Sequence, residues 1–120
     1  MRPGQLLALV ALTVALAACS VGIAELNGRP TKHYQESVTF RARVSRMQTL
    51  GGETLLELAD AQEHRIFVRA DGTPDVQPDD WVKVTGTLVP EARVGGKIVY
   101  DIVQVESITK TGAPWFRNLF

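Results

Sequence analysis

Five stretches of the chain alternate hydrophobic and polar residues, a pattern typical of half-buried β-strands. In the first, residues 38–47, the even positions up to Val44 are apolar and the odd positions are polar. The other four stretches are residues 53–60, 64–70, 81–89 and 97–108. Residues of the same parity within a strand share a face, so we expect one buried set. Its predicted members are Val38, Phe40, Val44, Leu56, Leu58, Ile66, Val68, Val82, Val84 and Leu88.

Glycine, proline and aspartate separate these stretches. Gly51-Gly52 and Gly95-Gly96 each lie between two strands, where they predict hairpin turns. Gly86 falls inside the fourth stretch and predicts a bulge or a tight bend. Residues 74–80 contain too much proline and aspartate for a strand and should form a connector. Only residues 23–26 predict helix, and that is a single turn.

The first residues predict export of the protein. Arg2 precedes an apolar run at residues 6–18, which is shorter than the roughly 20 residues that a membrane-spanning helix needs. The run ends in Leu16-Ala17-Ala18-Cys19, which resembles the lipobox of bacterial lipoproteins. The alternative is an ordinary secretory signal with a cysteine at the cleavage site by chance.

The lipobox resemblance implies a signal peptide at residues 1–18 and a lipid on the thiol of Cys19, followed by a tether at residues 19–22. Cys19 is the single cysteine of the chain, so an internal disulfide cannot be its purpose. The resemblance places the protein in the cell envelope, attached to a membrane through Cys19. Ser20 follows the cysteine and favours the outer membrane, facing the periplasm, if the host has two membranes.

The strand pattern of residues 23–110 resembles the OB-fold, a five-stranded Greek-key barrel. The resemblance rests on a long first strand, a leucine-rich second, a short third and a fourth that begins Asp80-Trp81-Val82. A small antiparallel sandwich or another five-stranded barrel is the alternative. The tail at residues 111–120 matches no family. Its aromatic residues, Trp115, Phe116 and Phe120, either fold back on the barrel or meet a partner or the membrane.

Composition and motifs favour binding over catalysis. The chain has 13 basic and 13 acidic side chains, and losing the leader removes only Arg2, so the mature protein has little net charge. His33 and His64 have no metal-binding spacing, and no nucleophile or phosphate-loop motif occurs. A haem-carrying envelope family of OB domains has a His-x-x-x-Tyr motif that this chain lacks. We therefore expect no cofactor, no metal and no enzymatic activity.

The candidate binding site lies on the outward face of the strands. Its predicted residues are Arg41, Arg43, Arg65, Phe67 and Arg69, with the four arginines forming one cationic patch around the phenylalanine. An exposed ring among arginines suits an anionic or ring-containing ligand, such as an oligosaccharide or a nucleotide. The alternative is an assembly lipoprotein that binds an envelope protein. Envelope location and neutral charge argue against nucleic acid as a partner.

Overall fold

The computed structural model of the protein describes residues 19–113, so the predicted signal peptide and the aromatic residues of the tail lie outside the described residues. Two short helices and six strands make up this part of the chain. In order they are β1 (Cys19–Ser20), α2 (Ile23–Gly28), α3 (Pro30–His33), β2 (Ser37–Leu50), β3 (Glu53–Ala59), β4 (Arg65–Asp71), β5 (Trp81–Val94) and β6 (Lys97–Lys110).

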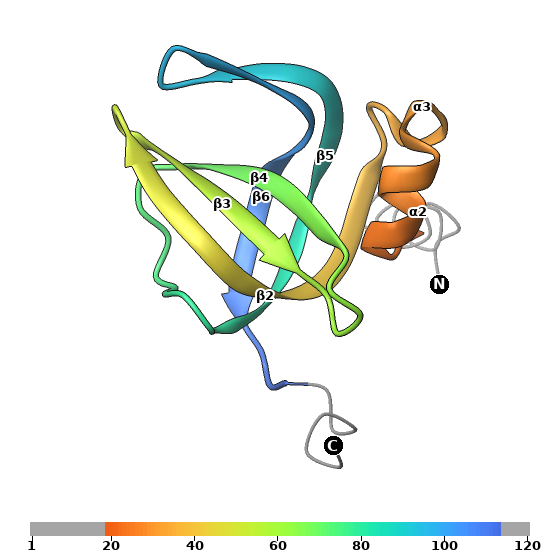
Figure 1. Cartoon of the computed structure of the whole chain (residues 1–120), viewed down its shortest axis with the longest axis horizontal. Helices are drawn as coiled ribbons and strands as arrows, with labels where there is room; N and C mark the ends of the chain where they lie inside the picture. Colours follow the sequence, from red (N-terminus) through yellow and green to blue (C-terminus); the bar gives the residue numbers. More distant parts are fainter. Residues whose placement is uncertain (1–18, 114–120) are drawn as a thin grey trace, which may run out of the picture.

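The five long strands form a closed barrel, as the sequence predicts. Neighbouring strands follow the order β2-β3-β4-β6-β5, and β5 also pairs with β2, which closes the ring. The β4–β6 pairing is parallel and brief, joining Val68 and Arg69 to Val103 and Gln104, whereas the other barrel pairings are antiparallel. Figure 1 shows the barrel with α2 and α3 beside the first half of β2.

Strand β2 is long because it pairs with two other strands, β5 and β3. Residues 37–43 pair with β5, whereas residues 43–50 pair with β3. The register with β3 shifts between Val44 and Arg46, so two residues of β2 face one of β3. Such a bulge bends a strand and resets which side chains point outward. Residues on the two halves of β2 therefore belong to different surfaces of the barrel.

The predicted core is confirmed. All ten predicted members are buried, with exposed fractions of 0–6%. Helix α2 extends this core, because Ile23 and Leu26 are each only 1% exposed and pack in the same cluster. The side-chain amide of Asn27 donates to the carbonyl oxygen of Arg65 at 2.8 Å and ties α2 to β4. Val76 adds a buried side chain from the connector.

Two glycines are required by close approach of other strands. At Gly86 the register of β5 with β6 shifts, as expected of a bulge, and a Cβ there would lie 2.3 Å from the carbonyl oxygen of Gln104. Gly95 has a φ of +57°, and a Cβ there would lie 2.6 Å from the Cβ of Leu50. The β5–β6 turn therefore lies directly against the end of β2.

The segment expected as a tether lies against the barrel. Cys19 and Ser20 form β1, in parallel register with Val38 and Thr39 of β2. The backbone N–H of Val21 donates to the carbonyl oxygen of Thr39 at 3.0 Å. Helix α2 begins at Ile23, so little slack is left between β1 and the barrel. No helix within residues 19–113 has both the length and the apolar composition needed to cross a membrane.

Candidate functional site

A groove lies on the outer face of β2, β3 and β4, around Phe67. It encloses about 310 Å³, and Phe67 is 37% exposed there. Cross-strand register explains the site, because Phe67 faces Glu57 of β3, which in turn faces Arg46 of β2. The groove is lined by Arg46, Met47, Gln48, Leu55, Glu57 and Phe67. Phe67 is thus partly exposed and lines a groove, as a ligand-binding face would require, and its role in binding stays a prediction.

Glu57 lies between two arginines at this groove. Its carboxylate oxygens accept from Arg65 at 2.8 Å and from Arg46 at 3.2 Å. These hydrogen bonds, first that from Arg46 and then that from Arg65, hold the pKa of the Glu57 carboxyl below its usual range. The glutamate therefore stays ionised and holds both guanidinium groups beside it.

The other arginines of this face are also paired with acids. Arg43 Nη2 lies 3.3 Å from Glu63 Oε1, and Arg65 Nη2 lies 3.3 Å from Glu63 Oε2. Arg69 is 2.5 Å from the carboxylate of Glu53. The predicted cationic patch is therefore wrong in its electrostatics: the face is a network of alternating charges. The acids come from β3 and the β3–β4 turn, and only the fold brings them beside these arginines.

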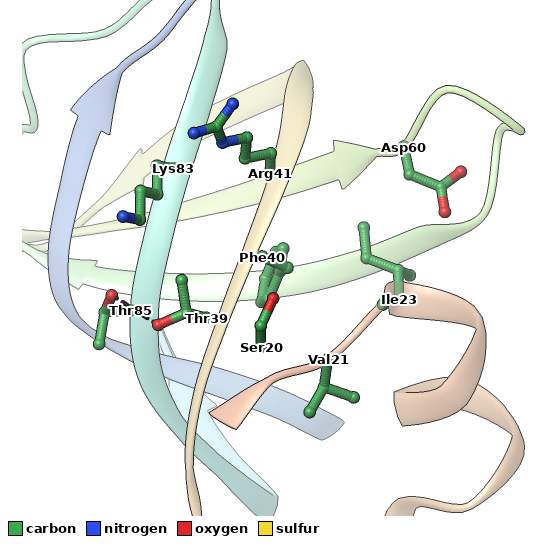
Figure 2. Close-up of a pocket in the computed structure, with 10 residues that line it drawn as sticks. Ser20, Val21, Ile23, Thr39, Phe40, Arg41, Asp60, Lys83 and Thr85 are labelled. Atoms are coloured by element: carbon green, nitrogen blue, oxygen red, sulfur yellow. Dashed lines mark hydrogen bonds between the residues drawn. The ribbon is translucent and has the colours of Figure 1, made fainter. Parts of the chain in front are cut away.

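Arg41 does not belong to this groove. It projects from the half of β2 that pairs with β5, where its register partner is Lys83. Both side chains are exposed, and together they line a second, larger hollow beside β1 (Figure 2). Of the five predicted site residues, Phe67 alone lines this groove. Arg65 and Arg69 flank it on β4, and Arg43 shares Glu63 with Arg65. Arg41 lies on another surface.

Sequence reasoning missed Arg46, Gln48 and Glu57 as groove residues. Strict alternation from Val44 would turn the side chain of Arg46 inward, and the bulge reverses that expectation. Glu57 does share the outward parity of β3, and this was the one sequence signal available for it. Its role between two arginines depends on the order of strands, which parity does not specify.

Both histidines are engaged with carboxylates. His33 is 8% exposed, and its ring nitrogens lie 2.9 Å from Glu25 and 3.3 Å from Glu36. His64 Nδ1 lies 3.0 Å from Asp60 Oδ2 in the β3–β4 turn. Among residues 19–113, no group of three or more histidine, cysteine, aspartate or glutamate side chains could hold a metal ion.

Solved structures share this barrel. An aspartyl-tRNA synthetase of Entamoeba histolytica aligns with 81% of the chain at 18% identity and a TM-score of 0.62. The asparaginyl-tRNA synthetase of Pyrococcus horikoshii aligns with 71% at 16% identity and a TM-score of 0.53. The domain is an OB-fold. This chain spans only 22% of each of these two synthetase chains. An OBody bound to hen egg-white lysozyme aligns with 69% at 12% identity and a TM-score of 0.52.

No family model and no curated protein matches the chain. The structural matches nevertheless correct one expectation from the sequence. The argument against nucleic acid as a partner is wrong, because this OB-fold is shared with synthetases whose names give tRNA as their substrate. The neutral net charge of the chain does not exclude nucleic acid as a partner, since a local surface can bind a ligand whatever the net charge of the chain.

Proposed function

We propose that the protein is a lipid-anchored, non-catalytic binding module of the cell envelope, and that its groove around Phe67 takes a ring-containing polar ligand. The anchor is the lipid on Cys19 implied by the lipobox-like residues 16–19. The localisation proposed is the outer membrane, facing the periplasm, in a host with two membranes. The OB-fold of the described residues supports a binding role, since such barrels commonly present this face to ligands.

The observation that carries the binding proposal is the partly exposed ring of Phe67, which lies in a groove lined by both polar and apolar side chains. Leu55 and Met47 add apolar surface, whereas Arg46, Glu57 and Gln48 add hydrogen-bonding groups. A flat ring stacked on a phenylalanine contributes about 1–3 kcal/mol. Arg46 and Glu57, the paired charges at this groove, suit a ligand with both hydrogen-bond donors and acceptors. A nucleotide or a sugar oligomer fits this description better than a purely anionic ligand.

A non-catalytic role is supported by what the histidines do. His33 joins α2 to the segment after α3 through Glu25 and Glu36, and His64 pairs with Asp60 inside its own turn. Each histidine is thereby occupied in holding a local structure. Glu57, the carboxylate of the groove around Phe67, is likewise held in ion pairs with Arg46 and Arg65.

The experiment compares Phe67→Ala with Tyr100→Ala in the full-length protein. Tyr100 is 67% exposed but lies on β6, outside the groove, so it is a matched aromatic control. The probes are a fluorescent single-stranded oligonucleotide and a fluorescent oligosaccharide, titrated while anisotropy is recorded. We expect Phe67→Ala to weaken binding of one probe by roughly 5- to 150-fold, the equivalent of one stacked ring. Equal binding by both variants and the parent protein would contradict the proposal.

A protein partner is the second candidate, and the β5–β6 hairpin favours it. Ile98 is 47% exposed beside Tyr100, so the hairpin presents apolar surface to solvent. The OBody match adds that a barrel of this fold is found bound to another protein, lysozyme. In cells treated with a crosslinker, a specific adduct lost in Tyr100→Ala and retained in Phe67→Ala would favour an assembly role over ligand binding.

A further inference from the structure

An open hollow of about 730 Å³ lies beside β1, on a different surface from the Phe67 groove. Its polar lining comes from three neighbouring strands and from the end of β3. These residues are Ser20, Thr39, Arg41, Asp60, Lys83 and Thr85. Figure 2 shows Arg41 and Lys83 extending from the adjacent strands β2 and β5.

The two cations of this hollow lack acidic partners. Within residues 19–113, neither Arg41 nor Lys83 forms an ion pair, although they are direct register partners. Side chains opposite one another in an antiparallel pair stand about 5 Å apart at Cβ, and like charges there are destabilising. The fold thus tolerates a repulsive pair at this place, whereas it pairs Arg43, Arg65 and Arg69 with acids.

Asp60 does not compensate for these cations. One carboxylate oxygen accepts from the backbone N–H groups of Gln62 and His64, both at 2.9 Å, and the other lies 3.0 Å from His64 Nδ1. In Figure 2 the carboxylate lies across the hollow and is directed away from Arg41 and Lys83. Its negative charge therefore stays with the β3–β4 turn.

Hydroxyl groups lie in a row next to the two cations. Ser20 of β1 is in register with Thr39 of β2, which is in register with Thr85 of β5. The Oγ1 atoms of Thr39 and Thr85 are 3.0 Å apart. A row of hydroxyl donors beside an arginine and a lysine is the chemistry that recognises phosphate oxygens.

Cys19, the predicted site of the lipid, directly precedes Ser20 of this hollow. Its position indicates which class of phosphate-containing molecule lies near the hollow. Cys19 is in register with Val38, three residues before Arg41. At about 4.8 Å between strands and about 3.3 Å per residue, the Cα atoms of Cys19 and Arg41 lie roughly 11 Å apart. A lipid chain on Cys19 would enter the hydrocarbon layer, which puts Arg41 and Lys83 at the level of the head groups.

We propose that this hollow faces the membrane and binds the phosphate head groups of anionic phospholipids, an inference that rests on the lipid anchor of the proposed function. Because β1 is paired with β2 and no slack tether intervenes, the anchor holds the barrel in one orientation. The groove around Phe67, on another face, then stays free for its ligand.

The test uses the full-length protein as produced in cells, purified in mild detergent and offered two vesicle populations together. One contains phosphatidylcholine alone and the other also contains phosphatidylglycerol. Each cation close to an anionic surface contributes about 1 kcal/mol, so two favour the anionic vesicles by roughly 10- to 30-fold. This preference should fall with added salt, because exposed charges are screened over about 8 Å at physiological ionic strength.

The variant Arg41→Gln/Lys83→Gln should bring this preference close to onefold. The control Arg93→Gln/Lys97→Gln also removes one arginine and one lysine, but from the β5–β6 hairpin, and should retain the preference for anionic vesicles. Equal binding of the parent protein to both vesicles would overturn the head-group site while leaving the anchor intact. Binding to neither would overturn the anchor, and this inference with it. An unchanged vesicle preference in the Arg41/Lys83 variant, with loss of oligonucleotide binding, would assign the hollow to nucleic acid instead.

Discussion

Replacing Phe40 by alanine tests the register on which both surfaces depend. Phe40 is 6% exposed and packs in the central cluster, so its removal leaves a cavity that the barrel cannot fully close. Phenylalanine-to-alanine changes in cores cost about 3–5 kcal/mol. A domain of this size has a free energy of unfolding of about 5–15 kcal/mol, so the variant should lose a large fraction of it.

The matched control is Thr39→Ala, one residue away on the opposite face of β2. Thr39 is half-buried and loses only its hydroxyl contact with Thr85, which corresponds to about 0.5–1.5 kcal/mol. Urea unfolding of both variants, followed by circular dichroism, should show a much lower midpoint for Phe40→Ala with little change of slope. Equal losses from the two variants would refute the register, because a slip by one residue exchanges the faces of the whole strand.

Two further predictions concern the anchor and the effect of pH. Cys19→Ala should leave an unprocessed precursor, and mass spectrometry of the native protein should find lipid on Cys19; a native protein without lipid would contradict the anchor. The hydrogen bond with Glu25, followed by that with Glu36, raises the pKa of His33 above its usual value of about 6.5. Because the folded state binds this proton more tightly, the stabilisation is fully present below about pH 6.5 and is lost as pH rises through the folded pKa. Urea unfolding at several pH values should show this loss in the parent protein and a weaker one in His33→Gln; the same pH dependence in both would refute the role of His33.

The strands, their inward faces and the class of fold could all be predicted from local sequence patterns. Burial alternates with a period of two along a strand, so each prediction needed only a few neighbouring residues. This is why the ten core positions, the hairpin glycines and the bulge at Gly86 were all found. Helix α2 extends two residues beyond the predicted turn, α3 was not predicted, and β2 and β5 extend beyond their predicted ends. Hairpin pairing continues past the hydrophobic stretch there, because backbone hydrogen bonds do not require apolar side chains.

The tertiary structure alone decided which outward-facing residues are neighbours. Arg41 and Arg43 share a parity, yet Arg41 meets Lys83 of β5 while Arg43 meets Glu63 of the β3–β4 turn. They separate because β2 changes partner at that point and bends at the bulge after Val44. Charge compensation depends on distances between strands far apart in sequence, which periodicity does not contain. Local sequence therefore predicts which side chains point inward or outward. It does not predict which outward side chains come together to form the two sites, because that depends on the order of the strands.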